Sequence, residues 1–551
     1  MQLRRRLMWL LLFAAAACSK SPLKQIGDSG PHGDPARNSD GGIILPDGAT
    51  AAAAVPCLPC DDFPAAPLLD PGDAPAGGAG AVPANVADLF GPAERGSAAA
   101  APCLLEPEPG SLVPRNWLRP RFRFQPVPGQ TLFELRLTTP HEKNPLVVYT
   151  STTIWTMPRP MWKALAAHAG GDPITVQVRG LDPAKPGMPG KSEAATWTVA
   201  PVDVGGSIVY WTTSGGSALK GFSVGDEGVV EVLRPAQTGG KCVGCHSSTP
   251  DGLYVAFASS AEAENGDQSH PELRSGKNPM ETPDFVTPAA QILLNRTEQQ
   301  LPTFSQAHWS KGDRIVITMF KGQIMWTDLE TTSGAQGTGW DFLARSGDAH
   351  PSAAYPSFSH DGNFVAYVAS SSTESAGATK DGDIYKVAFG ARKGGEATPV
   401  AGAASAEWNE YYPSASPDDK FLAFTRVLAP AESYDNPSAE IFVVPSEGGS
   451  ALRFAANDPA ACTGVLSPGI TNSWPKWAPV VNHAAGKTYY WLTFSSTRSE
   501  GAQPQLYVTP LVQDDASGVL TTYPAIYLWN QPASENNHTP AWDVFDIPID
   551  I

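Results

Sequence analysis

The sequence predicts an all-β protein in which a small β-sandwich precedes a six-bladed β-propeller. Three observations support this prediction: stretches of alternating apolar and polar residues, a strand motif that recurs along the second half, and many turn-forming residues, with 52 Gly and 53 Pro in 551 residues. Hydrophobic residues make up 42% of the chain, which is enough for an ordinary buried core. Many short strands separated by Gly- and Pro-rich turns are typical of sandwiches and propellers.

The N-terminus has the features of an export signal. Arg4–Arg6 precede an apolar run from Leu7 to Ala17 that is too short to span a bilayer. The small residues before Cys18 resemble a bacterial lipobox, which implies that residues 1–17 are a signal peptide and that acylated Cys18 anchors the mature chain to a membrane. Ser19 after the cysteine resembles an outer-membrane sorting signal. An ordinary secretory leader with a chance cysteine is the alternative.

Residues 18–101 are expected to form a disordered tether. They are rich in Pro, Gly and Ala, and no apolar period of 2 or 3.6 persists in them. Cys57 and Cys60 lie within this stretch, and in an oxidising compartment a disulfide between them is the expected state. A redox pair or half of a zinc site are alternatives, although zinc requires two further ligands and the neighbouring sequence offers no obvious ones.

Residues 102–202 are expected to form the sandwich. Apolar and polar residues alternate at 121–124, 133–137, 174–178 and 196–199. This alternation predicts strands with one buried and one exposed face. In pattern the region resembles immunoglobulin-like or fibronectin-like modules.

Residues 206–551 contain the recurring motif. Its two clearest copies begin at Tyr355, as Tyr-Pro-Ser-Phe-Ser-His-Asp-Gly, and at Tyr412, as Tyr-Pro-Ser-Ala-Ser-Pro-Asp-Asp. Weaker copies begin near His246, Ala307, Pro475 and Pro540. The spacing of roughly 50 to 65 residues accommodates about four short strands, which is one propeller blade.

The ring of blades is expected to close between its two ends. The last copy lacks its outer strands, and apolar strands at 208–211 and 219–222 can supply them by pairing with 542–547. The motif resembles the Pro-x-x-Ser-Pro-Asp-Gly-x-x-x-Ala-Phe repeat of TolB-type six-bladed propellers, over residues 206–551. This resemblance implies a fold and no particular activity.

One motif in the propeller region indicates cofactor chemistry. Cys242-Val-Gly-Cys245-His246 is a Cys-x-x-Cys-His sequence, the attachment motif of c-type haem. Two thiols at this spacing can bond the two vinyl groups of one porphyrin, and the imidazole that follows can bind the iron. His246 occupies the place that Pro356 and Pro413 hold in their repeats, which predicts a haem near one mouth of the central channel. A disulfide or thiol pair beside an incidental histidine is the alternative, and a zinc site lacks further ligands.

The second axial ligand of such a haem is left open by the sequence. Met280 lies in a Pro-flanked loop that resembles the loop methionine of small cytochromes c, and a thioether ligand would raise the reduction potential. His308 and His538 both lie near predicted strand entrances. An open iron position is the fourth possibility. The pairing of Cys103 and Cys462, with each other or with Cys57 and Cys60, is also undecided.

These features predict an envelope-anchored, haem c-binding propeller lipoprotein, at the outer membrane, that transfers electrons or docks an unidentified redox or envelope protein partner. A TolB-like interaction scaffold without a redox role is one alternative, and a peroxidase-like haem enzyme is another. A formal net charge of −17 disfavours nucleic acid as a partner. The sequence contains no serine nucleophile elbow, zincin motif or phosphate-binding loop.

Overall fold

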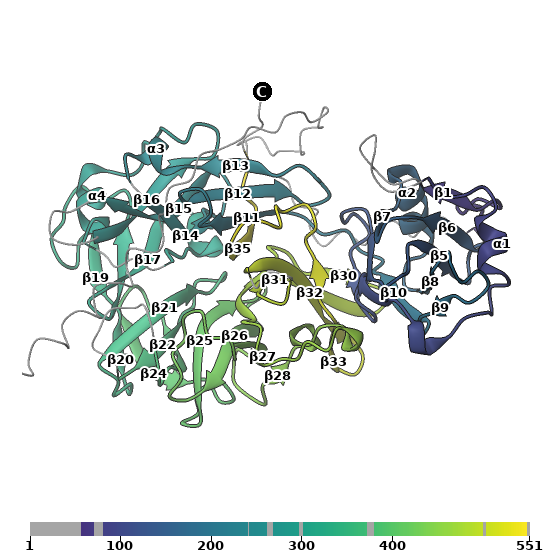
Figure 1. The fold of residues 1–551 in the computed structure, drawn as a ribbon. Helices are drawn as coiled ribbons and strands as arrows, with labels where there is room; N and C mark the ends of the chain where they lie inside the picture. The colour runs from purple at the N-terminus through teal and green to yellow at the C-terminus, as the bar shows by residue number, and fades with distance from the viewer. Residues whose placement is uncertain are drawn as a thin grey trace, which may run out of the picture.

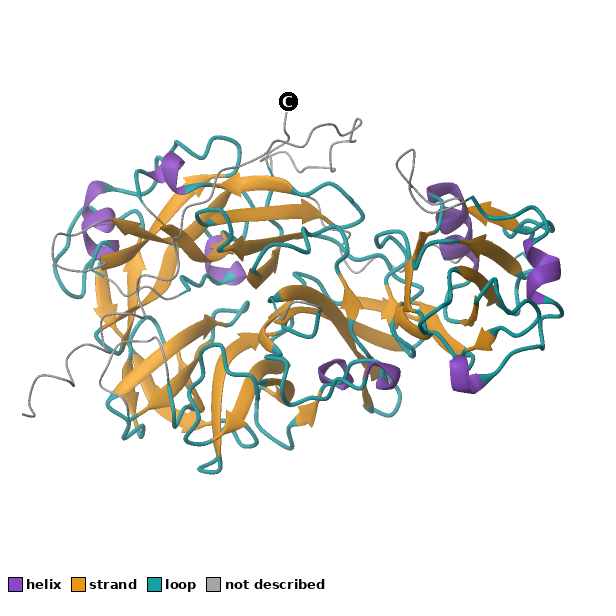
Figure 2. Ribbon diagram, in the orientation of Figure 1, coloured by secondary structure: helices purple, strands orange, loops and turns teal. Residues whose placement is uncertain are grey.

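The computed structural model describes residues 57–70, 81–240, 242–261, 268–296, 301–371, 379–499 and 503–547. Within these ranges the protein is almost entirely β-structure, with a sandwich at one end and a ring of sheets beside it (Figures 1 and 2). The all-β prediction is therefore confirmed. None of the described helices is long and apolar enough to cross a membrane. The signal peptide, Cys18 and most of the expected tether lie outside the described residues.

The sandwich consists of a larger and a smaller sheet with apolar side chains between them. In the larger sheet the strand order is β1-β6-β5-β8-β10-β3, with β9 beside β8, and the smaller sheet has the order β2-β4-β7. Phe122, Leu135 and Trp197 are completely or almost completely buried in this core. The strands expected at 121–124, 133–137, 174–178 and 196–199 are all present. The strand bounds are β1 Leu68–Asp70, β2 Cys103–Glu106, β3 Leu112–Val113, β4 Arg121–Gln125, β5 Leu132–Thr138, β6 Leu146–Thr150, β7 Ile154–Thr156, β8 Pro173–Leu181, β9 Gly190–Lys191 and β10 Ala195–Val199.

Part of the stretch expected to be a disordered tether packs on the sandwich. Strand β1 pairs in parallel with β6, and the short helix α1 (Val86–Phe90) lies against the larger sheet (Figure 1). Phe63, Val86 and Phe90 are at most 1% exposed. Phe63 lies in a bend, and Val86 and Phe90 are the two buried residues of the five-residue helix α1. They therefore produce no periodic pattern that sequence reasoning could detect.

The described part of the repeat region forms six sheets in sequence. Their strand orders are β13-β12-β11-β35, β14-β15-β16, β17-β18-β19, β20-β24-β23-β22-β21, β25-β26-β27-β28 and β29-β31-β32-β33, with β30 beside β31 and β34 beside β32. The bounds are β11 Ser207–Thr212, β12 Ala218–Ser223, β13 Val230–Leu233, β14 Cys242–Ser248, β15 Tyr254–Ala261, β16 Gln268–Ser275, β17 Ile315–Phe320, β18 Gln323–Asp328, β19 Trp340–Phe342, β20 Ala344–Ser346, β21 Ser352–Phe358, β22 Phe364–Ser370, β23 Asp383–Ala388, β24 Gly394–Pro399, β25 Trp408–Ala415, β26 Phe421–Leu428, β27 Glu440–Pro445, β28 Leu452–Arg453, β29 Ser473–Trp477, β30 Asn482–Ala484, β31 Lys487–Ser496, β32 Gln505–Asp514, β33 Leu520–Thr522, β34 Ile526–Tyr527 and β35 Asn537–Asp543. The short helix α2 (Arg159–His168) belongs to the sandwich. The repeat region contains the short helices α3 (Pro235–Thr238), α4 (Pro288–Leu294) and α5 (Gln306–Trp309).

The ring closes as the sequence predicted. Strand β35, near the end of the chain, pairs antiparallel with β11, and Ile208 lies opposite Trp542. The first sheet of the ring is thus built from both ends of the repeat region. Closure gives β11 a partner from the end of the repeat region and so covers the edge that would otherwise be left open.

In three blades a Ser or Thr hydroxyl and the Asp two residues later make the turn between the first two strands, at Thr249 and Asp251, Ser359 and Asp361, and Ser416 and Asp418. In the clearest copy the Ser359 hydroxyl donates to a carboxylate oxygen of Asp361 at 2.8 Å, and the backbone N–H of Asn363 donates to the same oxygen at 2.9 Å. Gly362 adopts φ +75°, a conformation that favours glycine. This local chemistry explains why the motif recurs in the sequence of these blades.

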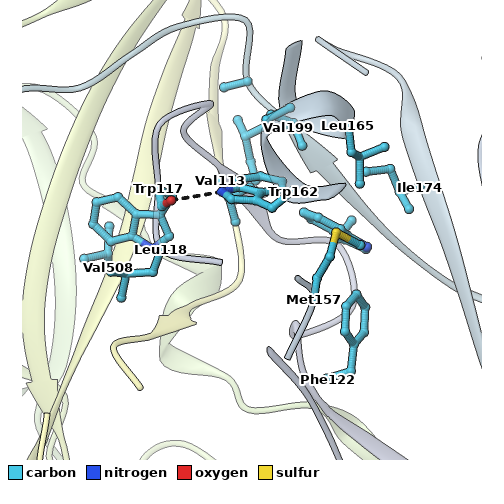
Figure 3. Packing of buried hydrophobic residues seen from close by; sticks show 14 of the residues in the cluster. Val113, Trp117, Leu118, Phe122, Met157, Trp162, Leu165, Ile174, Val199 and Val508 are labelled. Carbon is cyan, nitrogen blue, oxygen red and sulfur yellow. Dashed lines mark hydrogen bonds between the residues drawn. The ribbon is translucent and has the colours of Figure 1, made fainter. Parts of the chain in front are cut away.

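The sandwich and the propeller are joined through a shared apolar core and a disulfide. Trp117 and Val113 of the sandwich belong to the same buried cluster as Val508 of β32, and Figure 3 shows these side chains together. Cys103 of β2 is bonded to Cys462 of the propeller, 359 residues further along the chain. The sequence left this pairing open, and the structure decides it. The two parts therefore form one packed unit.

Candidate functional site in the central channel

The Cys-x-x-Cys-His motif lies on β14, the innermost strand of the second blade. Its residues are paired with β15, with Cys242 opposite Ser260 and His246 opposite Phe257. The register shifts between Gly244 and His246, so Cys245 forms a β-bulge, and its φ is +35°. A bulge turns one side chain out of the regular alternation. Here it directs Cys245 into the channel at the centre of the ring.

The same bulge occurs in the innermost strands of other blades. Four residues equivalent to Cys245 also have positive φ, and they are Tyr355 (48°), Tyr412 (55°), Trp474 (60°) and Thr539 (48°). Each lies in a strand whose register shifts at that point, or opposite such a shift. All of them line the channel. The sequence comparison that placed His246 at the position of Pro356 and Pro413 agrees with this arrangement.

In the third blade the structure differs from the sequence prediction that His308 lies beside a strand entrance at the channel. Its contribution to the channel is Leu301, followed by Pro302, rather than a residue near His308. His308 lies on α5, where its Nδ1–H donates to a carboxylate oxygen of Asp313 at 2.8 Å and its ring packs against the rings of Phe358 and Phe389. It is not among the residues that line the channel. Helix α5 follows the strand entrance of this blade, and the repeat was aligned to the helix instead of to the entrance at Pro302.

The channel is narrow and largely aromatic. The rings of Tyr412 and Trp474 are stacked with centroids 3.6 Å apart, and Tyr355 meets Tyr412 edge-on at 4.6 Å. The space left between the lining side chains is about 30 Å³. This volume is far below the 300–1,000 Å³ typical of small-molecule sites.

Burial determines the protonation of the groups around Cys245. It raises the pKa of the Cys245 thiol to about 11 and lowers the pKa of Lys476 to about 8. It also raises the pKa of the Asp543 carboxyl, which accepts a hydrogen bond from the backbone N–H of Ser248 at 2.8 Å. At neutral pH Cys245 is therefore a neutral thiol, and a neutral thiol is a poor nucleophile.

His246 is buried beside this thiol. His246 is only 2% exposed, and its Nε2–H donates to the carbonyl oxygen of Val209 at 3.0 Å. Because a carbonyl oxygen can only accept, this bond places the proton on Nε2 and leaves a lone pair on Nδ1. Nδ1 is buried and has no hydrogen-bond partner among the described residues. Burial also lowers the pKa of His246 to about 4, so the ring is neutral.

Of the candidate second ligands, the structure brings His538 to this region. His538 lies on β35, its ring contacts Trp211 at a centroid distance of 4.7 Å, and its Nδ1 bonds the Thr539 hydroxyl at 2.8 Å. Its pKa is lowered to about 4 by burial and, secondarily, by the nearby His246. Met280, by contrast, is 65% exposed in the loop after β16, which is the outermost strand of its blade.

The donor set suits covalent haem, but the closed channel has no room for the ring. Cys242 and Cys245 are free thiols, and the four other described cysteines are all disulfide-bonded. The lone pair on His246 Nδ1 is available. A porphyrin, however, cannot enter about 30 Å³ of space, and Gly244 packs so closely that an added Cβ would lie 3.1 Å from the Trp211 ring. The haem prediction thus agrees with the residue types and disagrees with the packing of β14.

A second group of ligand-type residues lies on the sandwich. Cys57, Cys60, Asp62 and His168 place one potential ligand atom each within 4.8 Å of one another. The sequence could not indicate His168, which comes from the end of α2. The two cysteines are disulfide-bonded, as predicted, and the His168 ring donates to Asp62 at 2.6 Å. The sulfurs are therefore engaged with each other.

Comparison with known proteins shows only distant structural likenesses. No protein-family model matches the sequence, and no curated protein matches it. Among solved structures, a TolB-type protein from Agrobacterium tumefaciens is 14% identical, with a TM-score of 0.32 over 61% of this chain and 97% of that one. An ancestral GH74 enzyme is 13% identical, with a TM-score of 0.36 over 60% and 40%. Prolyl oligopeptidase B from Galerina marginata is 11% identical, with a TM-score of 0.30 over 63% and 42%. At such identities no activity is carried over to this chain.

Proposed function

We propose that this chain is an exported, lipid-anchored propeller protein of the cell envelope that carries one haem c and transfers electrons to or from an envelope protein. Cys242 and Cys245 would bond the porphyrin, and His246 would bind the iron. The observation that supports this most directly is the state of the motif. Its two cysteines are the free pair among the described residues, and the imidazole that follows them has a buried Nδ1 without a partner.

The surrounding residues define what the site would do. A haem supplies one-electron redox chemistry, and its potential depends on the ligands and on solvent exclusion. His538 is near enough to His246 for the two rings to interact electrostatically, which supports His538 as the proposed second ligand. The aromatic rings of Tyr355, Tyr412 and Trp474 keep bulk water out of the channel. The site is therefore suited to electron exchange rather than to turnover of a diffusing substrate.

The narrow channel has a consequence for assembly. Because the closed ring leaves no room for a porphyrin, attachment would have to precede the packing of β14 against β15 and Trp211, and loaded protein would hold these residues in a more open arrangement than the one described. We expect folded protein made without haem to remain unloaded when haem and a reductant are added later. Protein exported together with cytochrome c maturation factors should be loaded.

The test is intact mass and a pyridine haemochrome spectrum of such matured protein. One haem per chain with a c-type spectrum is expected, and C242S and C245S should each weaken or abolish the covalent linkage. H538A should convert a six-coordinate low-spin spectrum to a high-spin one, while M280L, on the exposed loop, serves as the matched control without spectral change. An unmodified polypeptide mass after maturation refutes the proposal.

A TolB-like docking scaffold without a redox role is the second candidate function. The closed, tightly packed channel is the observation in its favour. The same mass measurement separates the two, because only the haem protein gains the mass of a porphyrin. A peroxidase-like enzyme would instead require an open iron position, and the unmodified protein would then show a high-spin ferric spectrum.

A further inference from the structure

The disulfide between Cys57 and Cys60 contributes less to the fold than the second disulfide of the molecule. It joins residues three positions apart, whereas Cys103 and Cys462 are 359 positions apart and link the sandwich to the propeller. A disulfide stabilises a fold mainly by closing a loop of the unfolded chain, and the effect grows with the length of that loop. The bond between Cys57 and Cys60 can therefore open at little cost to the stability of the protein.

The backbone around Cys60 is held by hydrogen bonds that do not involve the sulfur atoms. The backbone N–H of Cys60 donates to the carbonyl oxygen of His141, and the backbone N–H of Lys143 donates to the carbonyl oxygen of Cys60 at 2.9 Å. The Glu142 carboxylate accepts a hydrogen bond from the backbone N–H of Asp62 at 3.0 Å. These bonds remain when the S–S bond opens, so we expect the reduced form to keep the same local structure.

The two cysteines differ in how open they are to a reagent. Cys57 is partly buried, and the two residues between the cysteines, Leu58 and Pro59, are exposed, Leu58 by 77%. Cys60 is only 1% exposed. The rate of thiol–disulfide exchange depends on which sulfur is accessible to attack and on how readily the other sulfur leaves. A thiol that approaches from solvent therefore attacks Cys57, and Cys60 is the sulfur that is displaced.

A histidine–aspartate pair lies beside the two sulfur atoms. One polar atom of Asp62 and one ring nitrogen of His168 lie within 4.8 Å of each other and of both sulfurs. The His168 Nδ1–H donates to the Asp62 carboxylate at 2.6 Å, and the two side chains are 24% and 13% exposed. Histidine gains and loses a proton near neutral pH, and a carboxylate bonded to one ring nitrogen orients the ring and stabilises its protonated form. A thiolate formed at the buried sulfur of Cys60 therefore has a proton donor beside it.

We propose that Cys57 and Cys60 form a redox-active disulfide that dithiols reduce, with His168 as the proton donor to Cys60. This inference does not depend on the haem site.

The exchange proceeds in two steps. A thiol of the dithiol loses its proton to solvent and attacks the Cys57 sulfur, the bond between Cys57 and Cys60 breaks, and Cys60 leaves with the electron pair and takes a proton from His168. The second thiol then gives its proton to His168 and attacks the first sulfur of the dithiol, which releases Cys57 as a thiolate that takes a proton from solvent. Two electrons have passed from the dithiol, now a disulfide, to Cys57 and Cys60, now thiols.

The first experiment compares the two disulfides within one molecule. The folded mature chain is incubated with dithiothreitol at neutral pH, samples are quenched with an alkylating reagent, and each cysteine is followed by peptide mass mapping. We expect Cys57 and Cys60 to be reduced about tenfold faster than Cys103 and Cys462. Cys462 is itself exposed, so exposure alone predicts the opposite order. Equal rates, or slower reduction of Cys57 and Cys60, overturn the proposal.

The second experiment tests the proton donor. H168Q keeps a polar side chain that cannot carry the proton, so reduction of this disulfide should slow by about tenfold or more, while the rate of the second disulfide stays the same. H141Q is the matched control, because the His141 side chain is 25% exposed, is paired with Asp172 at 2.9 Å, and lies outside the group around the sulfurs. If H168Q is reduced as fast as H141Q, His168 donates no proton and the proposal fails.

A third measurement separates proton transfer from a structural role of His168. The ratio of thiol to disulfide at Cys57 and Cys60 is measured at equilibrium in mixtures of reduced and oxidised dithiothreitol. A group that only carries a proton changes the forward and reverse rates alike, so H168Q should leave this ratio unchanged. If H168Q shifts the ratio and leaves the rate of reduction unchanged, His168 stabilises one redox state only, and its assignment as proton donor is wrong.

Discussion

Arg179 should hold the N-terminal segment onto the sandwich, and replacing it offers a stringent test of the fold. Its guanidinium is 2% exposed and forms an ion pair with Glu134, whose side chain is 1% exposed. It also donates to backbone carbonyls of the segment that follows α1, at 2.8 Å to Pro92 and 3.3 Å to Arg95. One side chain therefore links β5, β8 and a segment that the sequence assigned to a tether.

The expected cost of R179M follows from these contacts. Breaking a buried ion pair by removing one partner typically costs about 3 to 5 kcal/mol, because the remaining charge stays buried. Arg136 remains 3.2 Å from Glu134 and compensates in part, so we expect about 3 kcal/mol from the pair. The two carbonyl bonds add about 1 kcal/mol each. For the sandwich this corresponds to a decrease in melting temperature on the order of 10 °C.

The assay combines urea unfolding, followed by tryptophan fluorescence, with limited proteolysis of residues 81–101. R179M should lower the free energy of unfolding by the amount above and expose that segment to protease. R136M is the matched control, because Arg136 contacts the same carboxylate but is 26% exposed and does not reach the segment. Its effect should stay below about 1 kcal/mol. If the unfolding free energies of the two variants agree within 1 kcal/mol and residues 81–101 stay protected from protease in both, the role assigned to Arg179 is wrong.

Three further predictions concern the junction and the ring. Burial raises the pKa of Glu108 to about 7, so the stabilising effect of the protonated side chain is present at acidic pH and is lost as the pH rises toward 7. E108Q should therefore flatten the dependence of the unfolding free energy on pH between pH 4.5 and 7, and should raise that free energy by up to about 3 kcal/mol at pH 8. Urea unfolding measures both effects, and an unchanged pH dependence would contradict this prediction. The Cys103–Cys462 disulfide closes a separation of 359 residues, so its loss in C462S should destabilise the protein by as much as about 5 kcal/mol. A melting temperature equal to that of the unmodified protein would argue against this prediction. Truncation after residue 536 removes β35 and leaves β11 without its partner, so this variant should aggregate on size-exclusion chromatography. Truncation after residue 547 keeps β35 and should leave a monomer. Equal elution of the two variants would show that closure is dispensable.

Strand positions, ring closure and the relation of the motif to the channel could be read from local pattern. The Ser-x-Asp turn and the alternation beside it involve residues close in sequence, and their chemistry recurs in three blades. The equivalence of His246 with Pro356 and Pro413 is likewise a property of the repeat. His308 does not line the channel, because the short helix α5 follows the strand entrance in that blade and the weak repeat was aligned to the helix instead of to Pro302.

The sequence by itself determined the all-β class, the repeat and its closure, and the residue types available at Cys242, Cys245 and His246, since these depend on short-range periodicity and spacing. Only the tertiary structure decided the pairing of Cys103 with Cys462, the packing of Phe63 and Phe90 on the sandwich, and the approach of His538 to His246. These features arise from contacts between residues far apart in the chain, whose formation depends on how whole sheets pack, and no local pattern encodes them.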